Sequence, residues 1–201
     1  MRNALKKILQ LLMIPLLFPF LVSQRKSIIL SDIRRWSDIN NLTNENDLDN
    51  FLCLLLQKEF RSLYYYRIHQ ESFLGVITAS LLSLIFKKEE NLCIWCNEIG
   101  SGLFIQHGVS TVIAAKSVGD NCWINQQVTI GHNGIGNSPI IGNNVVIRAG
   151  AKVIGNIKIG DNVVVGANAV VVKDIPPNCV VVGVPAYIIK RDGIKVHEKL
   201  N

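Results

Sequence analysis

The sequence of 201 residues has no dense basic arm and no basic recognition helix, although its formal net charge is +6. Its Lys and Arg residues are scattered along the chain or lie near its two ends. Binding to a nucleic-acid backbone requires a concentrated basic face, so we expect no nucleic-acid partner. Scattered basic charge suits an anionic cofactor or a membrane surface equally well.

The sequence also lacks the cysteine pattern of a disulfide framework or of a complete zinc site. Its five cysteines are an odd number, which favours a reducing, cytoplasmic compartment. Cys93 and Cys96 form one CxxC pair with no second pair at zinc-ligand spacing, so we interpret them as packed thiols and expect no metal. Charged residues are few at 18%, and hydrophobic residues make up 49%, which is typical of a folded chain.

Residues 1–30 contain an apolar segment that is too short for a straight membrane span. Its hydrophobic part, residues 8–22, has about 15 residues and includes Pro15 and Pro19, whereas a transmembrane helix needs about 20. Basic residues flank it, and no small-x-small cleavage site follows. We therefore predict that residues 8–22 contact the inner face of a membrane. A core helix or an oligomer-contact helix is the alternative.

Residues 31–90 are predicted to be α-helical. Between residues 48 and 68, apolar side chains recur at three- and four-residue steps, which places them on one face of a helix. Residues 72–86 form a second apolar helix candidate.

The strongest pattern is a six-residue period within residues 91–189. One series steps by six, with one interruption, through Val112, Val118, Ile124, Ile130, Ile141, Ile147, Val153, Ile159, Val165 and Val171. A second series of small or aliphatic residues lies four positions further on, at Cys122, Val128, Val145, Ala151, Ile157, Val163 and Ala169. Glycine and then Asp or Asn often follow the first series, and these residues tolerate the positive φ angles of tight corners.

A six-residue period with two inward positions describes one flat side of a triangular coil. Three sides make a rung of 18 residues, and stacked rungs bury a continuous apolar column. A β-sandwich would need longer strands and hairpin signals, which are missing. The fold prediction is mainly β: a parallel β-helix over residues 91–189, preceded by the helical region and followed by a C-terminal tail, residues 190–201.

Three further segments lie in or next to the periodic region: IGSGLFIQHG at residues 99–108, RAGAKVIGN at residues 148–156 and GVPA at residues 183–186. With the hexapeptides, they resemble the serine acetyltransferase-like branch of the hexapeptide-repeat acyltransferases and its polysaccharide O-acetyltransferase relatives. The resemblance implies a left-handed β-helix and a homotrimer with active sites between subunits. It also implies acetyl-CoA as co-substrate.

The resemblance further assigns roles to individual residues. His107 is implied as the general base that deprotonates an acceptor hydroxyl, and an imidazole suits this role because it titrates near neutral pH. The implied CoA contacts are Ala149, Gly150, Ala167, Gly183, Pro185, Lys190 and Arg191.

The sequence departs from the serine acetyltransferase pattern around the histidine. Gln106 stands where that family has an aspartate that meets the serine amino group, and a neutral amide cannot form this ion pair. Leu92 occupies the place of the aspartate that orients the histidine. Glu98 is a candidate replacement.

The interruption at residues 131–140 corresponds to a loop that projects from the β-helix in this family. Serine acetyltransferases carry an Arg-His pair before a proline there, whereas this chain has Asn137 and Ser138. We take His132, Asn133 and Ser138 as candidates for substrate contact.

These departures favour a sugar hydroxyl of a surface polysaccharide, or of its lipid-linked precursor, as the acceptor. L-Serine, giving O-acetylserine for cysteine synthesis, is the first alternative. A non-catalytic β-helix scaffold that binds partners through its N-terminal helices is the second.

Overall fold

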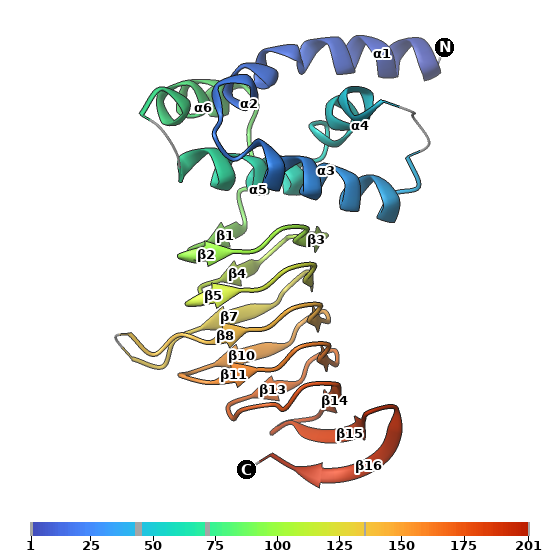
Figure 1. Ribbon diagram of the computed structural model, residues 1–201, viewed down its shortest axis with the longest axis vertical. Helices are drawn as coiled ribbons and strands as arrows, with labels where there is room; N and C mark the ends of the chain where they lie inside the picture. The colour runs from blue at the N-terminus through green and yellow to red at the C-terminus, as the bar shows by residue number, and fades with distance from the viewer. Residues whose placement is uncertain (1, 43–45, 71–72, 135, 201) are drawn as a thin grey trace. The chain divides into compact units, whose positions relative to one another are not determined.

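The computed structural model describes residues 2–42, 46–70, 73–134 and 136–200 (Figure 1). Backbone contacts divide the chain into two units, Met1–Glu90 and Asn91–Asn201. The first unit is built from helices, and the second is built from short strands.

The elements of the helical unit follow one another with short connections. In chain order they are α1 (Arg2–Leu12), η1 (Ile14–Leu16), α2 (Leu17–Val22), α3 (Lys26–Ile39), α4 (Asp47–Leu54), α5 (Lys58–His69) and α6 (Phe73–Ile85). The apolar pattern over residues 48–68 therefore belongs to two helices, α4 and α5. Gln57 has extended backbone angles (φ −86°, ψ 125°) and ends the run, while the Arg61 guanidinium donates to the carbonyl of Leu55 beside the break.

Aromatic side chains fill the core of the helical unit. Trp36 of α3 meets Phe60 of α5 edge to face, with ring centroids 5.2 Å apart. Phe51 of α4 lies 5.4 Å from Tyr64 in the same manner. Edge-to-face pairs of this kind add to the stabilisation from burial.

One ion pair lies in the core of the helical unit. Arg67 of α5 donates from Nε to Oδ2 of Asp32 in α3 at 2.9 Å, and both side chains are almost fully buried. Removing one partner of such a pair leaves an uncompensated buried charge. The pair therefore fixes how α3 and α5 pack.

The strands of the second unit form three sheets. The first sheet contains β1 (Leu92–Ile94), β4 (Thr111–Ile113), β7 (Thr129–Gly131), β10 (Lys152–Ile154) and β13 (Val170–Val171). The second contains β2 (Glu98–Ile99), β5 (Ser117–Val118), β8 (Ile140–Ile141) and β11 (Lys158–Ile159). The third contains β3 (Phe104–Gln106), β6 (Trp123–Asn125), β9 (Val146–Ile147), β12 (Val164–Val165) and β14 (Cys179–Val182), and then β15 (Tyr187–Arg191) and β16 (Ile194–Lys199).

The chain visits the three sheets in turn, so each circuit is one rung of a solenoid (Figure 1). Strands of successive rungs pair in parallel; Lys152 of β10 pairs with Val170 of β13, 18 residues further on. The predicted parallel solenoid with 18-residue rungs is confirmed.

The inward positions agree with the six-residue period at all but one place. Nine of the ten side chains of the first series are at most 2% exposed, and every member of the second series is buried. Val112 is the exception, because it is half-buried while Ile113 next to it is fully buried and pairs with Ile130. The assignment of Val112 to the core was wrong by one residue.

Asparagines and glycines form the corners between the second and third sheets. A Cβ on Gly142 would lie 2.5 Å from the Asp161 carboxylate, so only glycine fits there. Asn144, Asn162 and Asn178 have φ of 55–58°. Their side chains form a ladder, in which Asn144 donates to Asn162 at 3.2 Å and Asn162 donates to Asn178 at 2.9 Å. Stacked side-chain amides thus bind one rung to the next.

The C-terminus differs from the predicted tail. Residues 190–201 fall largely in β15 and β16, which pair antiparallel with each other and, through β15, with β14. Asp192 and Gly193 join the two strands with φ of 48° and 82°. An Asp-Gly pair at positive φ is a common hairpin turn, and this local signal was overlooked.

Truncating an inward side chain of the solenoid tests the fold. Ile147→Ala removes atoms that are 0% exposed and leaves a cavity between rungs, so we expect the free energy of unfolding to fall by about 2–5 kcal/mol. Val172→Ala is the matched control, because Val172 is 50% exposed. Equal denaturation midpoints in urea for both variants would contradict the packing described here.

Candidate active site

One edge of the solenoid is a column of corners at which the chain passes from the third sheet to the first. Backbone hydrogen bonds join successive corners: Gln127 N donates to Val109 O at 3.0 Å, Gly150 N to Gln126 O at 3.0 Å, and Asn168 N to Ala149 O at 2.9 Å. His107 lies at the first of these corners, directly after β3. The predicted cofactor residues Ala149, Gly150, Ala167 and Gly183 lie at later corners of the same column.

The corner at His107 is longer than the corners that follow it. From Ile105 to Ile113, the inward positions are eight residues apart, whereas the next corner needs six. His107 and Ser110 both have positive φ, of 51° and 54°. Non-glycine residues adopt this region at a cost, and such outliers gather at functional sites. The imidazole is exposed at the surface of the protomer.

Gln106, the residue before the histidine, is held by two donors from the next rung. Its side-chain oxygen accepts from Asn125 Nδ2 at 2.8 Å and from Trp123 Nε1 at 3.3 Å. Phe104 meets the Trp123 ring edge to face at 4.7 Å, and the Arg148 guanidinium lies 5.8 Å from the centre of that ring. These contacts fix the orientation of the Gln106 amide, so its NH₂ group is what it presents to a ligand.

Two oxygen atoms of the next rung are buried without a hydrogen-bond partner in the described part of the chain. They are Asn125 Oδ1 and Gln126 Oε1. A buried, unsatisfied acceptor costs about 1–3 kcal/mol, so such atoms call for a donor from a ligand or another subunit. Both belong to the rung that follows Gln106 and His107.

The loop residues lie at another edge of the solenoid. His132, Asn133 and Ser138 belong to the connection between β7 and β8, where the chain passes from the first sheet to the second. Figure 1 shows this loop projecting from the prism, and His132 and Asn133 are exposed. Within one chain, the structure does not bring them to the corner of His107.

Glu98 also lies away from the His107 corner. It is exposed on β2 in the second sheet, where it pairs with Ser117. A six-residue step moves the chain to the next side of the prism, so residues 98 and 107 lie on different sides. The prediction that Glu98 orients His107 therefore fails within a single chain.

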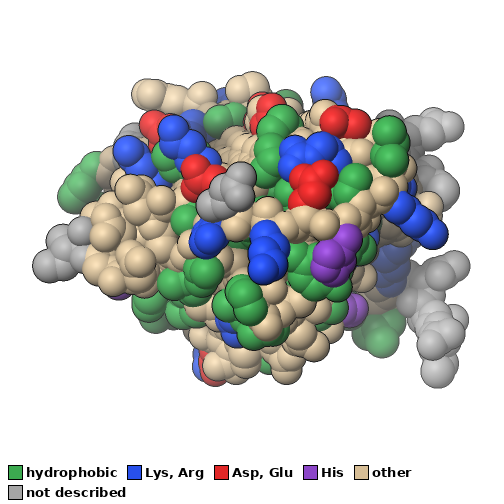
Figure 2. Space-filling model, turned by 90° about the horizontal axis from the view of Figure 1, so that it is seen from below, with side chains coloured by type: hydrophobic (Ala, Val, Ile, Leu, Met, Phe, Trp, Pro, Cys, Tyr) green, Lys and Arg blue, Asp and Glu red, His purple; other side chains and the backbone are tan. Residues whose placement is uncertain are grey.

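Lys190 and Arg191, the two basic residues predicted to contact CoA, differ in whether they are already paired. Arg191 Nη2 lies 2.5 Å from Glu198 Oε2 in the β15–β16 hairpin, and this hydrogen bond raises the pKa of Arg191. Its guanidinium is thus already paired, which argues against the predicted role on a CoA phosphate, whereas Lys190 is exposed. In Figure 2, which views the molecule from the side of β16, basic and acidic side chains lie side by side.

A cavity of about 340 Å³ lies at the GVPA segment. Its walls include Pro185, Ala186 and Tyr187 together with Lys173 and Lys199. The two lysines supply the positive charge that an anionic ligand would meet here.

The two CxxC cysteines differ in burial, since Cys93 is half-buried and Cys96 is buried. Cys96 is buried and donates to the carbonyl of Glu98 at 3.1 Å, and burial raises the pKa of its thiol. A thiol that stays protonated at neutral pH is a poor metal ligand. Among the residues with described positions, no three His, Cys, Asp or Glu side chains are grouped as a metal site.

Comparisons with known proteins agree with this geometry. A family profile described as bacterial transferase hexapeptide (six repeats) matches residues 138–173. The solved serine O-acetyltransferase of Brucella melitensis superposes with a TM-score of 0.66 at 30% identity, over 84% of this chain and 70% of that one. The chain belongs to the hexapeptide-repeat acyltransferases.

Two further members of the family are similar to this chain. A serine acetyltransferase of Synechococcus elongatus is 49% identical over 102 residues, which are 49% of this chain and 42% of that protein. A serine acetyltransferase of Brucella abortus, solved in complex with coenzyme A, superposes with a TM-score of 0.59 at 31% identity, over 85% of this chain and 69% of that one. The chain spans less than half the length of the Synechococcus relative.

Sequence reasoning missed several residues of this hexapeptide-repeat site. Trp123 and Asn125 were not candidates, although both stand at outward positions one rung after Gln106. A step of 19 residues, which is the period of 18 plus the one-residue slip at the His107 corner, joins Phe104 to Trp123 and Gln106 to Asn125 and could have found them. No motif in the sequence pointed to Lys173 or Lys199 as ligand-binding residues. Lys199 was also hidden because the hairpin that carries it was expected to be a tail.

Proposed function

We propose that this protein is an acetyl-CoA-dependent O-acetyltransferase in which His107 is the general base. The observation that carries the proposal is the single column of corners that begins at His107 and continues through Ala149, Gly150 and Ala167 to Gly183. It lies in a chain about half identical, over 102 residues, to a serine acetyltransferase.

The reaction requires one proton to move twice. The neutral imidazole of His107 takes the proton of the acceptor hydroxyl, and the oxygen attacks the carbonyl carbon of the thioester. The tetrahedral intermediate then expels the CoA sulfur, which receives the proton from the imidazolium. Fixed amide donors would stabilise the oxyanion. The exposed position of His107, at an elongated corner, leaves room for both substrates.

The column suits an extended cofactor because its corners are built from small residues. Gly150 has φ of 75°, and a Cβ there would lie 2.0 Å from Asn168 Oδ1, so no side chain separates a ligand from the backbone. The pantetheine arm of CoA would lie along Ala149, Gly150 and Ala167. Its phosphates would meet the lysines at the GVPA cavity.

The site is proposed to be completed in a homotrimer. His107 and the loop of His132 lie at different edges of one prism, so a neighbouring chain must bring its loop, and Glu98, to the histidine. The unsatisfied oxygens of Asn125 and Gln126 would then meet donors from the substrate or from that neighbour.

L-Serine is the first acceptor that we propose, on the strength of the serine acetyltransferase relatives. A sugar hydroxyl is the second, and one observation favours it. Gln106 is neutral and is locked by Trp123 and Asn125, so it offers the serine ammonium group no charge. Neutral amides beside unsatisfied carbonyl oxygens bind hydroxyl groups readily.

Removal of the imidazole tests the general base. His107→Ala should lower kcat/KM for acetyl transfer by at least about 100-fold, as the loss of general-base catalysis predicts. CoA release can be followed with a thiol reagent. His69→Ala, which removes an imidazole from α5 in the helical unit, is the control and should retain activity. A folded His107→Ala variant with full activity would remove this residue from the mechanism, and a wild-type protein inactive with every acceptor would favour the scaffold alternative.

Restoring a carboxylate next to the histidine separates the two acceptors. Gln106→Asp should raise kcat/KM for L-serine by about tenfold, because a charge-assisted hydrogen bond to the ammonium group contributes about 1.5–3 kcal/mol. The same change should weaken the use of hexoses and amino sugars. Gln127→Asp, at an exposed corner of the same column, controls for the added charge. If the wild-type protein turns over its best sugar far faster than serine, the second acceptor replaces the first.

A further inference from the structure

The helical unit exposes a large apolar surface on α1, η1, α2 and α6. We call these four elements the apolar platform. Leu5, Ile8 and Leu12 of α1 are 54–58% exposed. Because α6 packs against both η1 and α2, the surface continues from one segment to the other. Figure 1 shows α1, α2 and α6 along the same side of the helical unit.

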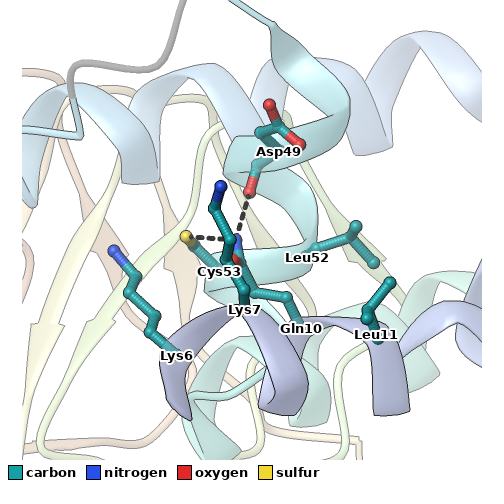
Figure 3. A pocket seen from close by; sticks show the side chains of 7 residues that line it. All are labelled: Lys6, Lys7, Gln10, Leu11, Asp49, Leu52 and Cys53. Atoms are coloured by element: carbon teal, nitrogen blue, oxygen red, sulfur yellow. Dashed lines mark hydrogen bonds between the residues drawn. The ribbon is translucent and has the colours of Figure 1, made fainter. Parts of the chain in front are cut away.

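In the usual amphipathic helix of a water-soluble protein, the apolar side faces the protein; in α1 the apolar side faces solvent instead. Its polar side faces the protein: Gln10 Nε2 donates to the Asp49 carbonyl at 3.4 Å and contacts Cys53 Sγ of α4 at 2.9 Å (Figure 3). Lys6 and Lys7 lie beside Gln10 around a cavity of about 590 Å³ between α1 and α4. Leu5, Ile8 and Leu12 on the other side of α1 therefore point to solvent, where an apolar helix face is unfavourable.

The last helix of the unit is turned in the same way. The buried residues of α6 are its small ones, Gly75 and Ala79. Several of its large apolar residues point outward, with Phe73 82%, Leu84 73% and Ile85 74% exposed. Two helices that both hide small or polar residues and expose large apolar ones indicate a surface built to meet an apolar medium.

The platform is fixed to the helical unit. Residues Leu5–Val22 are long and apolar enough to cross a membrane by length and composition, and 11% of this segment is buried. Yet Leu16 is fully buried and its carbonyl accepts from the Tyr64 hydroxyl at 2.7 Å, and Phe20 packs on Phe51 with ring centroids 5.4 Å apart. A spanning helix would have to break these contacts, so the segment fits an orientation parallel to a bilayer.

The charged residues next to the apolar platform indicate which kind of surface it binds. The elements α1, η1, α2 and α6 contain no Asp or Glu. Lys6 and Lys7 lie on α1, and Lys87 and Lys88 follow α6 and are exposed; Glu89 and Glu90 come next in the chain, and Glu90 lies 3.9 Å from Lys87. Lysines beside an apolar face bind acidic lipid headgroups while the apolar side chains enter the acyl region. A second copy of the chain on the same face would bring these lysines together.

We propose that the apolar platform binds the surface of an anionic phospholipid bilayer, with α1 and α6 lying in its plane. This binding is independent of the acetyl transfer proposed above. It would place the active unit close to a membrane without a transmembrane helix.

Sedimentation of the full chain with vesicles tests the proposal. The protein should bind vesicles of phosphatidylcholine with about a third phosphatidylglycerol, bind pure phosphatidylcholine much less, and be released by high salt, because part of the attraction is electrostatic. A double variant, Phe73→Gln with Leu84→Gln, should bind at least about tenfold more weakly, since each side chain then withdraws less apolar area from water. Its rate of acetyl transfer in solution should stay unchanged.

Ile194→Gln is the matched control, because Ile194 is 70% exposed but lies on β16; its vesicle binding should equal that of the wild type. No binding to anionic vesicles, or equal binding by the double variant, would overturn the proposal. Binding that resists high salt and alkaline extraction would overturn the in-plane orientation in favour of a spanning helix. Self-association that the double variant abolishes, without any vesicle binding, would assign the platform to a second copy of the chain.

Discussion

The burial of one branched aliphatic side chain per side of the prism is the constraint on which the structure of the second unit depends. Each inward Val or Ile packs on its equivalent in the rungs before and after it, so most sides keep the six-residue spacing, and extra residues are accommodated at one corner and in one projecting loop. Glycines and asparagines at the corners follow from the same constraint, because the chain must turn within one or two residues. The backbone positions at the regular corners are therefore repeated from rung to rung.

The candidate site uses both this regularity and the irregular corner at His107. Regular repetition stacks Ala149, Ala167 and Gly183 into one straight column, which suits a long, flexible cofactor. Between Ile105 and Ile113 the spacing widens to eight residues, and the extra residues carry the histidine to the surface. The next side is one residue shorter, from Ile113 to Val118, so this rung keeps one extra residue in total and the six-residue steps resume at Val118. The six-residue repeat thus provides the column for the cofactor, and a local change in its spacing exposes the histidine.

The solenoid could be predicted from the sequence because its inward Val and Ile residues recur every six positions. His107 could be found because this spacing is broken next to it. Val112 was misplaced since the widened corner displaces its neighbour Ile113 into the core, and a single series cannot show which of two adjacent aliphatic residues turns inward. Glu98 lies on another side of the prism within one chain, so its predicted role beside His107 depends on a neighbouring chain and stays a prediction. The break between α4 and α5 escaped notice because both helices direct apolar residues into one core, so the periodicity continues through Gln57.

The hairpin of β15 and β16 also determines how the solenoid ends. A parallel solenoid exposes unpaired N–H and C=O groups on its last rung, and these groups can template addition of another chain. Here β15 pairs with β14 in the opposite direction, and β16, the last strand of the sheet, carries the charged residues Lys195, Glu198 and Lys199. The edge strand of the third sheet therefore carries charged side chains, which disfavour the end-to-end addition of further chains.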